Sequence, residues 1–514
     1  MSSGSIARID PSSMPLVGRV AEQFQSYNVE MVEVTGGRFW KPYAQTADGS
    51  ADASETDTAG DGGIPAGMDP GLYEYRPPID LSNPRLRSLA AALAPAYVRV
   101  SGTWANTVYL PADGEDASMS PPGFSSVLRR DEWAGVVAFS DAVGAGIVTS
   151  MSVGTGSRDD DGVWTPVQAQ RLLDLTAKLG GVIVGAEFFN EPTMASMGGA
   201  PDGYDAAAFA RDHRLFCRFV HDQAPDWLVL GPGSVGESAS GGLGLTYGSA
   251  GVLPTEDLLT ALGGGNSQVE IDRFTFHHYG AASARCAGVG MPGTSPEEAV
   301  TDEWLSRVDD TLAFYAGMRD RFCGETPMWC TETAQAACGG DEWAGTFLDT
   351  FRYVDQLGRF ALGGVEVQFH NTLASSDYGL LDETTFAPRP NYWAALLWRR
   401  LMGTAVLDVR TLCRPGLFVY AHAFGSSSEE ERVTVVVVNA GLEEPRSLFS
   451  VVGGDRYTLS APELMGTEVH LNDRPLRVDG DTVLIPAGEP FDAGAVEFAP
   501  ATITFLALSD VSRH

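Results

Sequence analysis

Eight short apolar runs, separated by longer segments of helical periodicity, constrain the fold of this chain more than any other feature. Gly, Pro, Asn or Asp flank most of the runs, which is typical of strand ends. The runs are residues 24–31, 96–101, 146–152, 182–189, 227–231, 273–278, 327–331 and 364–369. Helical periodicity appears between several of them, at residues 167–179, 206–224, 297–321 and 343–357. Alternating strands and helices favour a parallel sheet, and eight units favour its closed form, a (β/α)₈ barrel.

The pattern changes after residue 407. Short runs with period-2 alternation follow at residues 417–424, 432–439, 446–452, 482–486 and 501–508, with turn residues between them. This pattern predicts an antiparallel β-sandwich of about 100 residues. The early segment 16–20 is expected to add a strand to it. The predicted organisation is an N-terminal segment (1–23), a catalytic barrel (24–407) and a β-sandwich domain (408–514).

Residues 44–69 form an insertion between the first two predicted strands. The segment is rich in Asp, Gly, Ser, Thr and Ala and contains a single Ile. Such a composition cannot bury enough apolar surface to fold by itself, so we expect a mobile surface segment. Because it leaves the top of the first strand, two interpretations stay open: a plain surface loop, or a rim over a cleft.

Two glutamates follow or end predicted barrel strands. Glu191 lies in Asn190-Glu191-Pro192, just after the fourth run, and Glu332 lies in Thr331-Glu332-Thr333, at the end of the seventh. The C-terminal ends of barrel strands carry the chemistry of this fold. Two carboxylates across one cleft can hydrolyse a glycosidic bond, with Glu191 as acid/base and Glu332 as nucleophile. The simpler alternative is that both are acidic residues in ordinary turns.

Charge limits the partners of this chain. It contains 34 basic and 67 acidic residues, a formal net charge of −33. Such a surface repels nucleic acids and anionic membranes and disfavours heavily sulfated polymers. No apolar run approaches the ~20 residues of a membrane span. The first eight residues lack the apolar core of a signal peptide, so we expect a cytoplasmic protein or a secreted one whose leader has been removed.

Six cysteines in 514 residues are too few for a disulfide scaffold, and free thiols are the default expectation. Cys286 and Cys338 would lie in loops at the same mouth of the barrel and could pair. The chain has no CxxC, no HExxH and no clustered ligand spacing, so we expect neither a metal nor a cofactor. Nothing in the sequence indicates an oligomeric state.

Six stretches have a residue order more specific than strand or helix periodicity requires. They are 188–192 (Phe-Phe-Asn-Glu-Pro), 276–279 (Phe-His-His-Tyr), 331–333 (Thr-Glu-Thr), 378–382 (Tyr-Gly-Leu-Leu-Asp), 390–393 (Pro-Asn-Tyr-Trp) and 401–407 (Leu-Met-Gly-Thr-Ala-Val-Leu). Together they resemble the heparanase and β-glucuronidase family, glycoside hydrolase family 79, in the clan of retaining (β/α)₈ glycosidases. The resemblance runs from about Leu16 to the C-terminus, apart from the insertion.

This resemblance implies roles for individual residues. Glu191 would be the acid/base, Glu332 the nucleophile, Asn190 a partner of the sugar 2-hydroxyl, and Tyr279 a hydrogen-bond donor to the nucleophile. Tyr378, with backbone amides around Gly339 and Gly340, resembles the receptor of the uronic acid carboxylate. Three further positions match sugar-contacting residues: Glu30, Thr103 and Gln368.

Three positions depart from the family pattern. Glu30 stands where heparanases carry Asp, Ser101-Gly102-Thr103-Trp104 replaces a Gly-Gly-Thr sequence, and Cys338-Gly339-Gly340 shifts the glycine run.

From the two glutamates and the resemblance we expect a retaining, exo-acting β-D-glucuronidase that releases glucuronic acid, 4-O-methylated or not, from carbohydrate β-glucuronides. Two alternatives stay open: an endo-β-glucuronidase of the heparanase type, and a catalytically inactive carbohydrate-binding protein.

Overall fold

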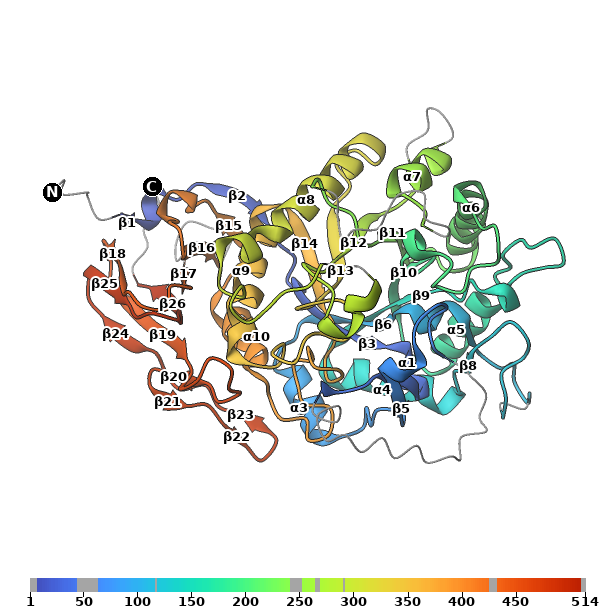
Figure 1. The fold of residues 1–514 in the computed structure, drawn as a ribbon, viewed down its shortest axis with the longest axis horizontal. Coiled ribbons are helices and arrows are strands. Elements are labelled where there is room, and N and C mark those ends of the chain that lie inside the picture. Colours follow the sequence, from blue (N-terminus) through green and yellow to red (C-terminus); the bar gives the residue numbers. More distant parts are fainter. Residues whose placement is uncertain are drawn as a thin grey trace.

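The computed structural model describes residues 7–43, 63–115, 118–240, 252–263, 269–289, 292–424 and 432–509. These residues form a closed eight-stranded parallel barrel beside a pair of sheets that carry the C-terminal strands (Figure 1). The predicted fold class is confirmed. Among the described residues, no helix is long and apolar enough to cross a membrane.

All eight predicted apolar runs become barrel strands. They are β3 (Gln25–Glu30), β6 (Ala96–Ser101), β9 (Ala145–Ser150), β10 (Ile183–Glu187), β11 (Leu228–Ser234), β12 (Arg273–His278), β13 (Met328–Thr333) and β14 (Val365–His370). The bounds of β6 and β12 match the prediction, and the others differ by at most three residues at either end. Pairing of β14 with β3 closes the barrel.

Helices between the strands cover the outside of the barrel. In chain order, the described ones are α1 (Met31–Thr35), α3 (Pro84–Ala91), α4 (Arg130–Val143), α5 (Val167–Lys178), α6 (Ala206–Gln223), α7 (Thr255–Gly263), α8 (Asp302–Phe322), α9 (Phe347–Leu362) and α10 (Pro390–Leu401). In α6, Asp205 caps the first turn, and Phe209, Phe216 and Val220 are buried on one face. This capped, amphipathic pattern is what makes such a segment helical against a sheet.

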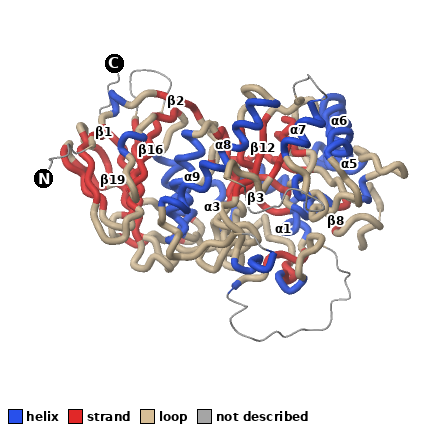
Figure 2. The backbone as a smooth tube through the Cα atoms, turned by 45° about the horizontal axis from the view of Figure 1, so that its top comes forward, coloured by secondary structure: helices blue, strands red, loops and turns tan. Residues whose placement is uncertain are grey.

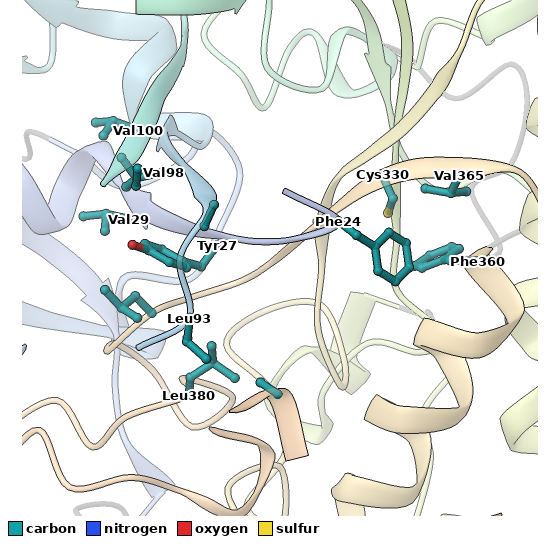
Figure 3. Packing of buried hydrophobic residues seen from close by; sticks show 14 of the residues in the cluster. Phe24, Tyr27, Val29, Leu93, Val98, Val100, Cys330, Phe360, Val365 and Leu380 are labelled. Atoms are coloured by element: carbon teal, nitrogen blue, oxygen red, sulfur yellow. The ribbon is translucent and has the colours of Figure 1, made fainter. Parts of the chain in front are cut away.

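Strand alternation separates two apolar layers. Val98 and Val100 pack outward in the layer between strands and helices (Figure 3). Arg99, between them, therefore points into the barrel, since successive side chains of a strand face opposite sides. Below it, an apolar plug that includes Trp329 and Phe369 fills the barrel interior. The polar chemistry is thereby confined to the C-terminal mouth.

The C-terminal strands form two sheets. The larger contains, in order, β2 (Leu16–Arg19), β15 (Ala405–Leu407), β16 (Leu417–Ala423), β17 (Val433–Asn439), β26 (Thr502–Leu508), β19 (Gly454–Ser460), β20 (His470–Leu471) and β21 (Arg474–Pro475), with β24 (Glu489–Phe491) beside β19. The smaller contains β1 (Arg8–Ile9), β18 (Arg446–Ser450) and β25 (Gly494–Phe498). An apolar cluster from strands of both sheets lies between them. The early segment therefore joins the larger sheet as predicted, through β2.

The other face of the larger sheet packs on the barrel helices. Helix α9 contacts β15, β16 and β17, while α10 contacts β26. Figure 2 shows the strands of these sheets gathered at one end of the molecule, next to α9. At this interface the Tyr420 hydroxyl donates to Asp355 Oδ1 at 2.5 Å. Gly358 leaves room for the Tyr420 ring, because a Cβ there would lie 2.2 Å from Cγ of that ring.

A short hairpin brackets the insertion. Strands β4 (Gly37–Trp40) and β5 (Tyr73–Arg76) pair antiparallel, and the rings of Trp40 and Tyr73 stack 4.6 Å apart. Most of the insertion, residues 44–62, lies outside the described residues, as do residues 241–251. In the described part, Pro65 and Met68 line the cavity that contains Glu191 and Glu332. This end of the insertion thus belongs to a rim.

Candidate active site

Glu191 is held in an unusual backbone conformation after β10. Its φ and ψ are both 58°, in the left-handed region that non-glycine residues seldom adopt. The flanking backbone is fixed: the Glu191 N–H donates to Gly233 O at 3.2 Å, and Asn106 exchanges two 3.1 Å hydrogen bonds with the backbone of Asn190. Such conformations persist where surrounding contacts determine them. Here they direct the Glu191 carboxylate into the cavity at the barrel mouth.

Glu332 lies on β13 among hydrogen-bond donors. The Tyr279 hydroxyl donates to its Oε1 at 2.6 Å, and Arg99 Nη1 approaches its Oε2 at 3.2 Å. Asn371 Nδ2 lies 3.5 Å from the same Oε1. Donors of this kind favour the ionised carboxylate. The Tyr279 contact is the one that the family resemblance implied.

His277 joins the two glutamates. Its Nδ1 is 2.9 Å from Glu191 Oε1 and 3.7 Å from Glu332 Oε2. One oxygen of each carboxylate and a ring nitrogen of His277 all lie within 4.8 Å of one another. Retaining glycosidases hold their two carboxyl groups about 5–5.5 Å apart, and inverting ones hold them farther apart. The separation here fits the first geometry.

Arg99 places a cation beneath the two glutamates. It is fully buried and bonds Glu187 Oε2 and Asn190 Oδ1, each at 2.7 Å. Among the described residues, Glu191, His277 and Glu332 are the only group close enough to hold a metal ion. The guanidinium 3.2 Å from Glu332 places a positive charge beside this cluster, which disfavours a further cation there.

The surroundings give the buried carboxyl groups different pKa values. Burial, aided by the nearby charge of Glu332, raises the pKa of Glu191, although its bond to His277 opposes the shift. Burial also acts on Glu187, but Arg99 and His277 outweigh it and hold the pKa of Glu187 below its usual value. Two titratable groups with opposite shifts in one site are typical of acid–base catalysis.

A cavity of about 120 Å³ contains both glutamates. Six of the residues predicted for the site line it: Glu30, Thr103, Glu191, Tyr279, Glu332 and Tyr378. Trp104 lines it as well, together with Trp40 and Tyr73 of the hairpin. The other residues that line the cavity are largely apolar. In such a low-dielectric environment the charges of the carboxyl groups interact strongly with one another.

Glu30 and Gly102 fit together closely. Glu30 is buried, its Oε2 has no hydrogen-bond partner among the described residues, and burial and Glu332 raise its pKa. Gly102 has φ 86°, and a Cβ there would lie 1.4 Å from Glu30 Oε2. The glycine at position 102 therefore makes room for Glu30, since a side chain there would displace the carboxylate of Glu30.

Three other residues predicted to contact the sugar, Asn190, Gly339 and Gly340, have N–H donors without a partner among the described residues. Asn190 Nδ2 is buried without a partner in the described part of the chain. Gly339 and Gly340 have φ of 83° and 80°, and no acceptor for their N–H groups is found among the described residues. A Cβ at Gly340 would lie 3.2 Å from the Tyr378 side chain, so the glycine turn and the tyrosine are neighbours.

Four residues predicted for the site are not among those that line the cavity: Asn190, Gly339, Gly340 and Gln368. Val367 and Phe369 belong to the apolar plug inside the barrel, so Gln368 between them faces the opposite side. It does not line the cavity, and Asn371, three residues later, does. Asn371 Nδ2 donates to the hydroxyls of Tyr279 at 3.1 Å and Tyr378 at 3.0 Å.

Sequence reasoning missed four polar residues of this network: Arg99, Glu187, His277 and Asn371. The first three lie on strands that were recognised by their apolar residues. The alternation of side chains along these strands could have revealed the charged ones, because a charged side chain in a buried strand must point toward other polar groups. The neighbouring His278 is structural, with Nδ1 3.0 Å from the Thr311 hydroxyl.

No family model matches the chain. Among curated proteins, heparanase-like protein 1 of Arabidopsis thaliana is 26% identical over 403 residues, covering 74% of this chain and 68% of that protein. Heparanase of Mus musculus is 27% identical over 484 residues, covering 82% and 84%. Baicalin-beta-D-glucuronidase of Scutellaria baicalensis is 28% identical over 234 residues, covering 42% and 44%.

Solved structures share the fold at low sequence identity. A 4-O-alpha-L-rhamnosyl-beta-D-glucuronidase of Fusarium oxysporum 12S superposes with a TM-score of 0.64 and 10% identity over 98% of this chain and 100% of that one. An alpha-L-arabinofuranosidase of Thermotoga maritima gives a TM-score of 0.63 and 13% identity over 98% and 99%. These likenesses show a common architecture of barrel and β-sheets.

Proposed function

We propose that this chain, a glycosidase related to the heparanases and β-glucuronidases, is a retaining, exo-acting β-D-glucuronidase. One observation carries the proposal: Glu191 and Glu332 reach into one small cavity with carboxylate oxygens within 4.8 Å of each other. At that distance one carboxylate can attack the anomeric carbon while the other protonates the leaving oxygen. Carbohydrate is accordingly the substrate class.

In the first step Glu332 attacks the anomeric carbon and Glu191 protonates the departing oxygen. Arg99 can only donate, and its Nη2 lies 3.4 Å from His277 Nε2, so the arrangement favours a ring proton on Nδ1 over one on Nε2. That proton is donated to Glu191 Oε1, which leaves Oε2 to carry the acidic proton. The raised pKa of Glu191 favours its protonated form before the step.

In the second step water replaces the ester formed on Glu332. Esterification removes the negative charge that helped to raise the pKa of Glu191. Glu191 then accepts a proton from the attacking water more readily, so one residue serves as acid and then as base. Arg99 and Tyr279 stabilise Glu332 as it leaves the sugar as a carboxylate.

The carboxylate of the sugar would be received by Tyr378 and the glycine turn. The Tyr378 hydroxyl accepts from Asn371, which leaves its own proton for an anionic ligand. The free N–H groups of Gly339 and Gly340 add two donors that a side chain would obstruct. Hydrogen bonds to charged groups contribute about 1.5–3 kcal/mol each, enough to separate a glucuronide from a glucoside.

The shape of the site supports exo action. The catalytic cavity is small, and Trp40, Pro65 and Met68 are among the residues that line it. A larger cavity of about 510 Å³ shares Gly236 and Tyr279 with it, and could accept the leaving group. The heparanases among the relatives favour the alternative of an endo-β-glucuronidase. That alternative requires both sides of the catalytic cavity to be open to a polymer.

The proposal is tested with 4-nitrophenyl β-glycosides of glucuronic acid, glucose, galactose and xylose, assayed side by side. We expect kcat/KM to be highest for the glucuronide. Tyr378→Phe should lower that value about tenfold or more while leaving the glucoside nearly unchanged, since only the glucuronide loses a charged hydrogen bond. Equal loss on both sugars would assign Tyr378 a structural role. A preference for a neutral glycoside in the unaltered enzyme would contradict the proposal.

A further inference from the structure

Two loops at the mouth of the barrel are joined side by side. The loop after β12 and the loop after β13 form a parallel bridge between Ala282 and Ala337. The Ser283 N–H donates to Ala337 O at 3.0 Å, and the Ala337 N–H donates to Ala281 O at 2.9 Å. These bonds fix one loop against the other. Each loop carries one cysteine close to this bridge.

The two cysteines, Cys286 and Cys338, meet through their side chains. Their thiols are free and hydrogen-bond to each other. The Ser283 hydroxyl donates to Cys338 O at 3.2 Å, and the Cys286 N–H donates to Ser283 O at 2.8 Å, so Ser283 anchors both residues. Cys286 is buried, whereas Cys338 is half-buried and lines the catalytic cavity.

We propose that Cys286 and Cys338 are a disulfide site, which on oxidation cross-links the two loops beside the catalytic cavity. The inference does not depend on the identity of the sugar, because it rests on the contact between the thiols and on the fixed loop backbones. Its consequence is local. Cys338 precedes Gly339 and Gly340, so the cross-link would tie the glycine turn to the loop after β12.

The reaction requires an oxidant, and a low-molecular-weight disulfide such as oxidised glutathione suffices. Cys338, the half-buried member of the pair, lines the cavity, and its thiolate attacks that disulfide and releases one glutathione. The contact with Cys286 and burial raise the pKa of the Cys338 thiol, which slows this first step. The Cys286 sulfur then attacks Cys338 Sγ and releases the second glutathione. One protein disulfide forms, one small disulfide is reduced, and the two thiol protons leave on the two glutathione molecules.

The surroundings of Cys286 suit it to the second attack. In the free thiol pair the hydrogen bond from Cys338 lowers the pKa of Cys286; once Cys338 carries glutathione that bond is gone, and the charge of Arg285 still lowers the pKa of Cys286 against the opposing effect of burial. A thiolate is the attacking form in disulfide exchange. By contrast, Cys330 is buried in the barrel and hydrogen-bonds to Glu332 O at 3.5 Å, and Cys413 contacts Val419 O at 3.7 Å.

The test compares the full-length protein after incubation with oxidised glutathione or with dithiothreitol. Free thiols are alkylated, the protein is digested without reduction, and peptides are identified by mass spectrometry. We expect one linked pair of peptides containing Cys286 and Cys338 in the oxidised sample only. Separate alkylation of both residues, or a lasting glutathione adduct on Cys338, would overturn the proposal.

Thermal unfolding gives a second, independent measurement. Closing the loop between the two cysteines restricts the unfolded chain, so the oxidised protein should melt about 3–6 °C higher than the reduced one. Cys286→Ser and Cys338→Ser should each abolish this difference, and Cys413→Ser should retain it. A difference that persists in both serine variants of the pair would place the cross-link elsewhere and refute the assignment.

Discussion

Glu191 and Glu332 are the same type of side chain, and their neighbours separate their roles. Tyr279 and Arg99 contact Glu332 directly, at 2.6 and 3.2 Å. Burial and the charge of Glu332 raise the pKa of Glu191, which has His277 as its hydrogen-bond partner. A charged nucleophile beside a protonated acid is what double displacement requires.

The two glutamate substitutions should therefore differ in how the loss of activity depends on the leaving group of the substrate. Glu332→Gln should remove nearly all activity on every substrate, because no nucleophile remains. Glu191→Gln should lower kcat/KM about 10²–10⁴-fold for alkyl glucuronides and much less for 2,4-dinitrophenyl glucuronide, whose leaving group needs no proton. A linear free-energy plot against leaving-group pKa provides the measurement. Equal losses across that series would show that Glu191 is not the acid.

Glu33 on α1 should make stability depend on pH. It is buried, accepts from the Glu30 N–H at 2.6 Å and from Ser375 Oγ at 2.5 Å, and burial raises its pKa from 4.5 to about 7. The folded state therefore retains a proton that the unfolded state loses above pH 4.5. The associated stability is complete below that pH and is lost as pH rises toward 7, by up to about 3 kcal/mol.

Replacing Glu33 with glutamine removes this titration. We expect the melting temperature of Glu33→Gln to fall less between pH 5 and pH 8 than that of the unaltered protein. Glu497→Gln, at an exposed position of β25, is the matched control and should keep the original slope. Identical slopes for all three proteins would mean that Glu33 is ionised at little cost in the folded state.

At the scale of elements, α9 joins the barrel to the larger sheet. Gly358 of α9 faces the Tyr420 ring of β16, where a Cβ would lie 2.2 Å from the ring. Gly358→Ala should destabilise the protein by about 1–3 kcal/mol, because the methyl group overpacks this interface. Gly317→Ala in α8 meets nothing within 4 Å and should stabilise by about 0.4–1 kcal/mol. Denaturant unfolding measures the free energy of unfolding of both variants. A Gly358→Ala variant as stable as the unaltered protein would show that the Tyr420 ring moves to make room for the methyl group.

The elements also show how far the sequence predicts this structure. Strong apolar runs located every barrel strand, because a strand buried on both faces needs continuous apolar residues. Strand β19 was not predicted, since its residues are mostly polar and half-exposed and only its pairing with β26 makes it a strand. The two glutamates were found from local motifs. Gln368, which the resemblance implied as a sugar contact, lies between two residues of the apolar plug and does not line the cavity, because the sequence does not fix which alternating residues point inward.

At the scale of the whole molecule, charge should restrict the substrate. The net charge of −33 repels a sulfated polymer, and Glu303, Asp309 and Asp310 line the larger cavity, where Arg307 is the only basic residue among its described lining. We expect no shortening of heparan sulfate chains at low or high salt, while a short unsulfated glucuronide is cleaved in the same buffer. Size-exclusion analysis showing internal cuts would favour the endo alternative.

The stereochemistry of the first-formed product tests the central claim most directly. Proton NMR can follow 4-nitrophenyl β-D-glucuronide hydrolysis at high enzyme concentration, before the sugar equilibrates in solution. A retaining exo-β-D-glucuronidase forms β-glucuronic acid first, with the α-anomer appearing later by mutarotation. Initial release of the α-anomer would mean single displacement and would contradict the roles given to Glu191 and Glu332. Absence of any cleavage would contradict the proposed substrate.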